Sequence, residues 1–89
     1  MTAQNDDWFV YILGCADDTL YTGIAKDTEK RLQQHNTDNI NGAKYTRSRR
    51  PVTLLYSEPC ASRSAASKRE YEIKKLSRAK KCLLIARDS

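Results

Sequence analysis

The sequence lacks the features typical of disulfide-stabilised, zinc-binding or membrane proteins. Its three cysteines, Cys15, Cys60 and Cys82, are scattered, odd in number and never arranged as C-x-x-C. This pattern favours neither a disulfide framework nor a zinc knuckle, and it predicts reduced thiols. The longest apolar run, residues 8–13, is far shorter than the roughly 20 residues that span a bilayer, and no basic segment precedes it. We therefore expect a soluble cytoplasmic protein.

Internal repeats, low-complexity stretches and interdomain linkers are also absent from the chain. Its 89 residues are close to the smallest size at which one apolar core suffices without covalent or metal staples. We expect a single domain over residues 8–86, preceded by a polar segment, residues 1–7, that is frayed or disordered.

The net charge of +5 is unevenly distributed. Residues 1–43 are net acidic, whereas residues 44–89 carry thirteen Lys and Arg against four Asp and Glu. Lysine-rich helices are often only solvated faces. The dense cluster from Lys44 to Pro51 favours a nucleic-acid contact instead, because an aromatic ring lies among cations there. The candidate nucleic-acid-binding residues are Lys44, Tyr45, Arg47 and Arg49.

The order of predicted elements begins with a hairpin and a helix. Residues 8–13 are β-branched and aromatic and predict a strand buried on both faces. A turn at Asp17 and Asp18 leads into a second strand over residues 20–24. Asp27 can cap a helix over residues 28–36, anchored mainly by Leu32.

The second half of the chain predicts a loop, a strand and two helices. Residues 37–50 have little periodicity and predict a long surface loop. A third strand is expected over residues 52–56, ended by Pro59. Ser62 then starts a helix to about Leu76, and Ser77 can cap a last helix. The fold class is α+β, with a small three-stranded antiparallel sheet flanked by helices in the order β-β-α-β-α-α.

The register of the hairpin decides where Tyr11 and Tyr21 point. A two-residue loop would place the two phenols on opposite faces of the sheet. A three-residue loop over residues 16–18 pairs Tyr11 with Gly23 and puts both phenols on one face, with open space at Gly23 beside the Tyr11 ring. Catalysis by both phenols needs the second register, which we predict. A packing role stays open for either ring.

Two further positions carry chemistry that suits a phosphodiester. Arg31 and His35 are spaced i, i+4 on one helix face and could together hold a phosphate. Glu70 lies at the edge of the apolar stripe of its helix, and Glu72 points to solvent. Glu70 is either a structural salt-bridge partner, for example of Arg31, or an oxygen ligand for a divalent cation.

Four segments of the chain resemble the motifs of a known family. The segments VYIL, LYTGIAKDTEKRLQQHN, GAKYTRSRRPVTLLYSE and SAASKREYEIKKL are similar, in order and spacing, to the motifs of the GIY-YIG nuclease superfamily. The resemblance covers about residues 8–80 and is greatest to short stand-alone members, which are similar to the nuclease domain of structure-specific DNA-repair endonucleases.

The resemblance implies a role for each candidate residue. The catalytic set would be Tyr11, Tyr21, Arg31, His35 and Glu70. Glu70 would be the single ligand of one Mg²⁺ or Mn²⁺ ion. Tyr11 would take a proton from the attacking water, helped by cationic neighbours that favour its phenolate. Arg31 would neutralise charge in the transition state. His35 would orient Tyr11 or the water, and Tyr21 would position the substrate or Tyr11 by hydrogen bonding.

The chain departs from the family pattern at two positions. Phe9 replaces the glycine of the first half-motif, and Thr22 replaces the isoleucine of the second. Neither position supplies a catalytic group, so the departures bear on substrate preference rather than chemistry. We expect no accessory DNA-binding domain, and therefore low sequence specificity.

The leading hypothesis is therefore a metal-dependent DNA endonuclease, with an exonuclease as a variant and RNA not excluded as substrate. It would select branched, nicked or single-stranded structure and serve DNA repair or recombination. The alternative is a non-catalytic nucleic-acid-binding module on the same scaffold. A carboxylate in a polyanion site argues against that alternative, because it would repel phosphate. A protein-interaction adaptor has no specific support.

Overall fold

A computed structural model describes residues 7–87 of the chain. The elements are β1 (Trp8–Gly14), β2 (Leu20–Ala25), α1 (Thr28–Thr37), α2 (Lys44–Arg47), β3 (Thr53–Cys60), α3 (Arg63–Lys74) and α4 (Arg78–Arg87). The predicted α+β class and its element order are confirmed. The short helix α2 is an addition, because it lies where the sequence predicted only a loop. The segment expected to be frayed falls, except for Asp7, outside the described residues.

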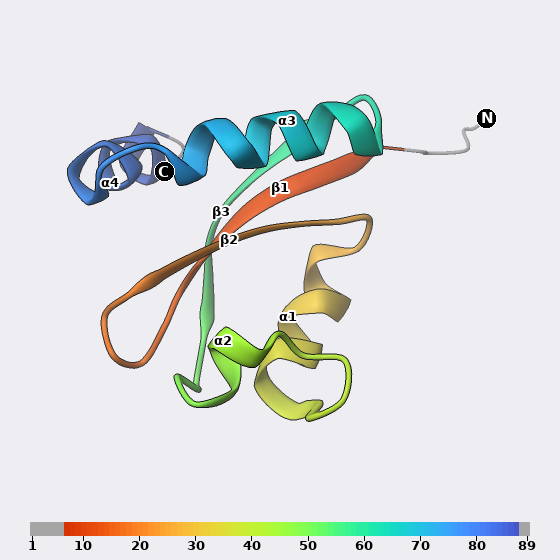
Figure 1. The fold of residues 1–89 in the computed structure, drawn as a ribbon, viewed down its shortest axis with the longest axis vertical. Helices are drawn as coiled ribbons and strands as arrows, with labels where there is room; N and C mark the ends of the chain where they lie inside the picture. Colours follow the sequence, from red (N-terminus) through yellow and green to blue (C-terminus); the bar gives the residue numbers. More distant parts are fainter. Residues whose placement is uncertain (1–6, 88–89) are drawn as a thin grey trace.

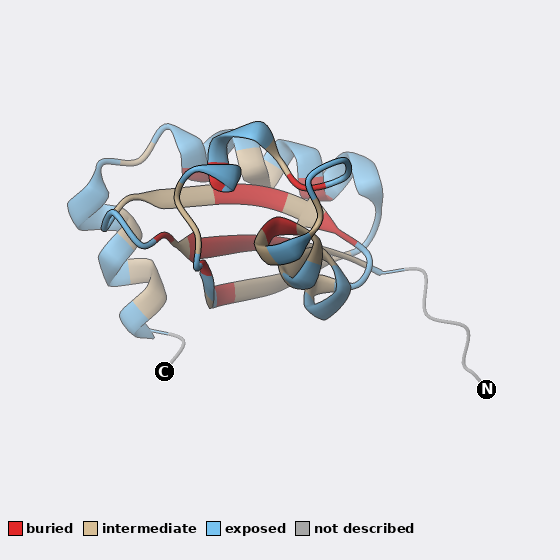
Figure 2. Ribbon diagram, turned by 90° about the horizontal axis from the view of Figure 1, so that it is seen from below, coloured by how far each residue is buried: buried red, intermediate tan, exposed pale blue. Residues whose placement is uncertain are grey.

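Three antiparallel strands form one sheet in the order β2-β1-β3. The central strand β1 is buried on both faces, as predicted, and Figure 2 shows the buried positions gathered on the strands. Tyr11 and Leu13 belong to one apolar cluster, against which Leu32 of α1 packs. Val10 and Ile12 belong to another, which includes Ile73 of α3. The sheet therefore lies between α1 and α2 on one side and α3 and α4 on the other (Figure 1).

The hairpin adopts the predicted register. The Cys15 N–H donates to the Thr19 carbonyl over 2.9 Å, which closes a loop over residues 16–18. Asp18 accommodates the turn with φ of 67°, a left-handed conformation that Asp tolerates better than most residues. Tyr11 lies opposite Gly23 and Leu13 lies opposite Tyr21. Both phenols therefore lie on the α1 side of the sheet.

The third strand is longer than expected, since β3 continues through Pro59 to Cys60. The prediction that Pro59 ends this strand is wrong. The strand β3 lies at the edge of the sheet, and a proline that lacks an N–H is tolerated there because one side of an edge strand has no partner. The pairing of Pro59 with Phe9 is kept.

The helix starts follow the predicted caps. Asp27 accepts a hydrogen bond from the Lys30 N–H at the start of α1, and Ser62 accepts one from Ala65 at the start of α3. The Ser77 hydroxyl accepts the Lys80 N–H at the start of α4. All three cysteines are free. Among the helices of residues 7–87, none combines the length and the apolar character needed to cross a membrane.

Candidate active site

Tyr11 and His35 are joined by a hydrogen bond in the interior of the α1 side. The Tyr11 hydroxyl lies 2.9 Å from Nε2 of His35. Tyr11 is 2% exposed and His35 is fully buried. Strand β1 and helix α1 therefore place these two groups together, far apart as they are in the sequence.

Thr46 of α2 sets the proton positions in this pair. Its Oγ1 donates to the Ala43 carbonyl over 3.0 Å and lies 2.8 Å from Nδ1 of His35. A hydroxyl that has given its only proton to a carbonyl can only accept from the ring. Nδ1 of His35 therefore carries the proton, Nε2 accepts, and the Tyr11 hydroxyl is the donor. This assignment follows from the hydrogen-bond network.

Burial keeps both partners neutral. Desolvation raises the pKa of Tyr11 to about 12, and the nearby Arg31 acts in the opposite direction. Desolvation, together with the charges of Arg31 and Arg50, lowers the pKa of His35 to about 4. We expected the cationic neighbours to favour the Tyr11 phenolate. In the protein without ligands their effect is outweighed by burial.

Gly23 gives the Tyr11 ring room to lie against β2. A Cβ at this position would lie 2.5 Å from the Tyr11 hydroxyl oxygen and 2.7 Å from the ring carbon that carries it. The space predicted beside Gly23 is therefore not open but filled by the phenol. Because β2 is an outer strand of the sheet, the Tyr11 hydroxyl extends toward the β2 edge.

Tyr21 also contacts His35, through its aromatic ring. Its ring meets His35 edge to face at 5.2 Å between centroids and stacks on Tyr45 at 5.7 Å. The Arg49 guanidinium covers Tyr45 at 3.9 Å from the ring centroid. Arg49 also forms an ion pair with Asp17 at 2.9 Å. The two predicted nucleic-acid-binding residues Tyr45 and Arg49 are thus engaged with each other and with the hairpin.

Arg31 lies on the same helix face as His35, as predicted, but their roles differ. The half-buried Arg31 donates to the Asn41 carbonyl over 2.6 Å and to Gln34 over 2.9 Å. His35 has no exposed surface, and both of its ring nitrogens are occupied. The expectation that the pair jointly holds a phosphate is therefore wrong for His35, whose contact is with Tyr11.

Glu70 projects from α3, which packs against β1 and β2. Its side chain is 24% exposed and pairs with Lys74 at 3.2 Å, so the structural salt bridge that we considered with Arg31 is formed with Lys74 instead. Glu72 is more exposed, at 55%, and pairs with Arg69. The negative charge of Glu70 is close enough to contribute to the raised pKa of Tyr11. This effect is the smallest of those acting on Tyr11, so it places Glu70 within electrostatic range of the phenol but not in contact with it.

A divalent cation would find one suitable carboxylate here. Among the described residues, no three His, Cys, Asp or Glu side chains gather as a ready-made metal cage. Mg²⁺ commonly binds to one or two carboxylates and completes its shell with substrate phosphate and water. The half-buried oxygens of Glu70 fit that kind of site.

The basic segment near the site contains some exposed cations and some cations that form hydrogen bonds within the protein. Lys44 and Arg47 are exposed on α2. Arg50, in contrast, donates to the carbonyls of His35 and Asp38 and so holds the end of α1. Lys44 and Arg47 are thus better placed for a polyanion than Arg49 or Arg50.

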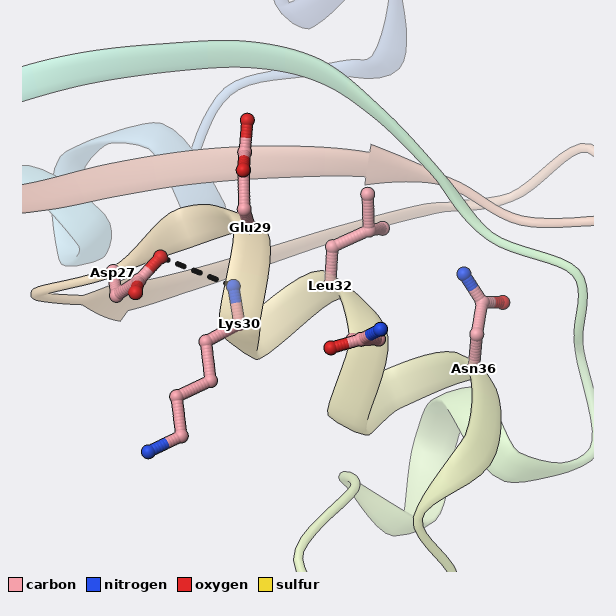
Figure 3. A pocket seen from close by; sticks show the side chains of 6 residues that line it. Asp27, Glu29, Lys30, Leu32 and Asn36 are labelled. Atoms are coloured by element: carbon pink, nitrogen blue, oxygen red, sulfur yellow. Dashed lines mark hydrogen bonds between the residues drawn. The ribbon is translucent and has the colours of Figure 1, made fainter.

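A hollow of about 580 Å³ lies along α1, away from these residues. Figure 3 shows Glu29, Leu32 and Asn36 pointing to one side of the helix and Lys30 pointing to another. The Asn36 amide exchanges two hydrogen bonds with the backbone of Val52 and is structural. None of the predicted site residues lines this hollow, so it is not the candidate active site.

Sequence reasoning missed Thr46, whose hydroxyl fixes the histidine tautomer. Thr46 is fully buried although its neighbours Lys44, Tyr45 and Arg47 are exposed. Only its place in a basic stretch was visible, and a single threonine there carries no periodic signal. Its role depends on how α2 packs on α1.

Residues 7–82 match the GIY-YIG catalytic domain. A UPF0213 protein from Desulfotalea psychrophila is 58% identical over 78 residues, which cover 88% of this chain and 70% of that protein. A UPF0213 protein from Staphylococcus saprophyticus is 56% identical over 81 residues, which cover 91% of this chain and 96% of that protein. The names of these relatives state no activity.

Two solved structures are similar to this fold. The solution NMR structure of a UPF0213 protein from Bacillus halodurans has a TM-score of 0.56 at 41% identity and covers 90% of this chain and 83% of that one. A protein from E. faecalis, also solved by NMR, has a TM-score of 0.59 at 39% identity, with the same coverage of 90% and 83%.

Proposed function

This chain belongs to the GIY-YIG family, a nuclease superfamily, and we propose that it is a divalent-metal-dependent nuclease that hydrolyses phosphodiester bonds in DNA. The observation that carries the proposal is the buried hydrogen bond between Tyr11 and His35, with Tyr21 against the histidine and the charges of Arg31 and Glu70 both acting on Tyr11. A module that only binds nucleic acid would not require a buried phenol that donates a hydrogen bond to a neutral imidazole.

The hydrogen-bond direction supports a proton relay through Tyr11. As the attacking water loses a proton to the Tyr11 oxygen, the proton of the phenol passes to Nε2 of His35. The Tyr11 hydroxyl is thus restored and an imidazolium forms, held by its Nδ1–H to Thr46. The relay lets a phenol with a pKa of about 12 receive a proton without existing as a free phenolate.

The remaining side chains bind and orient the phosphate. Arg31 supplies the positive charge that offsets the charge developing on the phosphoryl oxygens. Glu70 would hold Mg²⁺ or Mn²⁺, which as a Lewis acid polarises the phosphoryl oxygen and stabilises the leaving oxygen. Tyr21 keeps His35 in place from the side.

The substrate preference follows from what the domain offers a nucleic acid. Lys44 and Arg47 are exposed cations suited to phosphates, which carry no sequence information. We therefore propose selectivity for branched, nicked or single-stranded DNA rather than for sequence, and a role in DNA repair or recombination. The three free cysteines support a reducing, cytoplasmic setting.

The test is cleavage of a defined set of substrates by the purified chain. Branched, nicked, single-stranded and duplex DNA, with matched RNA versions, are incubated with and without Mg²⁺ after chelation of carried-over metal. We expect Mg²⁺-dependent cleavage with a preference among DNA structures. Binding to all substrates with no cleavage of any would contradict the proposal and favour a non-catalytic binding module.

A further inference from the structure

A second group of cations lies on the α3 side of the sheet, where three elements meet. Trp8 at the start of β1 is half-buried, and the exposed Lys26 and Arg63 approach its ring. The Lys26 Nζ is 6.0 Å from the Trp8 ring centroid, and the Arg63 guanidinium carbon is 5.6 Å from it. Phe9 pairs with Ala25, the last residue of β2, so Lys26 directly after β2 comes next to Trp8 of β1.

The positions of Lys26 and Arg63 are not explained by stabilisation of the neighbouring helices. Arg63 is the first residue of α3, whose first turn contains no acidic residue. Lys26 directly precedes Asp27, the residue that caps α1. Positive charge at a helix N-terminus opposes the macrodipole. The acidic residues of α3 pair with other cations, Glu70 with Lys74 and Glu72 with Arg69.

The group lies in line with the proposed metal ligand. Arg63 and Glu70 are seven residues apart on α3, which places them within about 20° of the same face and about 10 Å apart along the axis. This distance corresponds to about three stacked nucleotides of one strand. Lys26 follows β2, the strand against which the Tyr11 hydroxyl lies. A strand that runs along α3 from a phosphate at Glu70 would therefore reach Arg63 and, beside it at the Trp8 ring, Lys26.

We propose that Lys26 and Arg63, held beside the Trp8 ring, bind backbone phosphates of the substrate strand about three nucleotides from the phosphate that is cleaved. This inference rests on the proposed nuclease function. The Trp8 ring limits the motion of both cations, so less conformational entropy is lost when they meet a phosphate. The enzyme would therefore require a minimum number of nucleotides on one side of the cleaved phosphate.

The test compares Lys26→Gln/Arg63→Gln with a matched control, Lys80→Gln/Arg87→Gln, which removes the same two charges from the exposed side of α4. Fluorescence anisotropy measures binding of single-stranded oligonucleotides over a range of salt concentrations. We expect the slope of log K against log salt to fall by about 1.4 in the first variant and to stay unchanged in the control. Equal slopes in the wild type and both variants would overturn the inference.

A second measurement separates binding from a structural role. Thermal unfolding should show the Lys26→Gln/Arg63→Gln variant to be as stable as the wild type or more stable, because cations are removed from helix N-termini. A lower melting temperature with unchanged binding would mean that the cations only support the Trp8 ring, and would overturn the inference.

The two proposals fail in distinguishable ways. Binding is measured without metal and does not depend on cleavage. Cleavage by the wild type together with unchanged salt slopes would reject the phosphate site and leave the nuclease function standing. A reduced slope in a protein that cleaves nothing would reject the nuclease function and leave a binding site for nucleic-acid phosphates.

Discussion

At the scale of single residues, the protons of the candidate site are fixed by three side chains from three elements. Thr46 of α2 accepts from His35 of α1, which in turn accepts from Tyr11 of β1. All three groups are buried. Because the Thr46 hydroxyl donates to the Ala43 carbonyl, it must accept from Nδ1 of His35, and Nε2 must then accept from Tyr11. The proposed proton relay through Tyr11 therefore starts from a defined arrangement of protons.

Replacing Thr46 by Val should disrupt this arrangement with little change of shape. The Nδ1–H of His35 would lose its acceptor, which costs about 1–3 kcal/mol of stability for a buried donor. The histidine could then no longer be held as an acceptor for Tyr11, and we expect single-turnover cleavage to fall by about 100-fold. Thr46→Ser keeps the hydroxyl and should retain most activity. Full activity in Thr46→Val would show that the tautomer does not matter.

The buried histidine should make stability depend on pH in a defined window. The unfolded chain binds a proton on His35 near pH 6.5, but the folded protein does so only near pH 4, so the unfolded state holds more protons between these values. Stability should therefore be fully present above pH 6.5 and decrease as pH falls toward 4, by roughly 3 kcal/mol.

Urea unfolding at a series of pH values measures this effect, with His35→Gln as the comparison that lacks the titrating group. Asp17 and Asp38, whose pKa values are lowered by hydrogen bonds, act only at lower pH, below their ordinary value of 3.8. A wild-type stability that does not change between pH 6.5 and 4 would contradict the burial of a neutral imidazole.

At the scale of elements, the sequence was informative where the pattern is local. The three-residue loop, chosen so that both phenols share one face of the sheet, placed Tyr11 opposite Gly23, and the i, i+4 spacing placed Arg31 beside His35. The helix α2 was missed because it is only four residues long and has no apolar repeat. The length of β3 was underestimated because a proline is acceptable only in an edge strand, and the order of strands is not a local property.

The hairpin register can be tested at Gly23. Gly23→Ala would place a methyl group 2.5 Å from the Tyr11 hydroxyl oxygen, so the phenol must move away from its position against β2. We expect a loss of about 1–3 kcal/mol in stability and loss of cleavage, measured by thermal unfolding and by the substrate assay.

Gly14→Ala in the same hairpin is the control. Its methyl group would meet a terminal carbon of the Leu55 side chain at 2.8 Å, and that side chain is 40% exposed and can turn aside. It should lower stability less and leave cleavage intact. Equal activity in both variants would mean that the position of the phenol is not critical.

At the scale of the whole molecule, the charges are arranged around the sheet rather than spread evenly. Lys44 and Arg47 belong to α2 on one side of the sheet, and Arg63 belongs to α3 on the other side (Figure 1). Lys26 lies beside the Trp8 ring, as Arg63 does. The acidic first half and the basic second half of the sequence predicted a polyanion partner. Which cations are free and which are structural depended on the packing, as Arg50 shows.

Charge reversal on α2 should weaken binding to every nucleic acid alike. In Lys44→Glu/Arg47→Glu we expect lower affinity for all sequences tested and a shallower salt dependence, because both residues would contact phosphates. Electrophoretic mobility shifts over a salt series measure both effects, and Lys80→Glu/Arg87→Glu is the charge-matched comparison. Binding that equals the wild type would remove α2 from the binding surface.

The central claim is that Glu70 binds a divalent cation that acts together with Tyr11 and Tyr21. The most direct test is a Mg²⁺ titration of cleavage by Glu70→Gln, with Glu72→Gln on the same helix as the control. Both variants lose one charge, but only Glu70 is half-buried and acts on Tyr11. We predict that Glu70→Gln abolishes Mg²⁺-dependent cleavage while binding DNA as tightly as the wild type or more tightly, and that Glu72→Gln cleaves normally. Unchanged cleavage by Glu70→Gln would contradict the proposed active site.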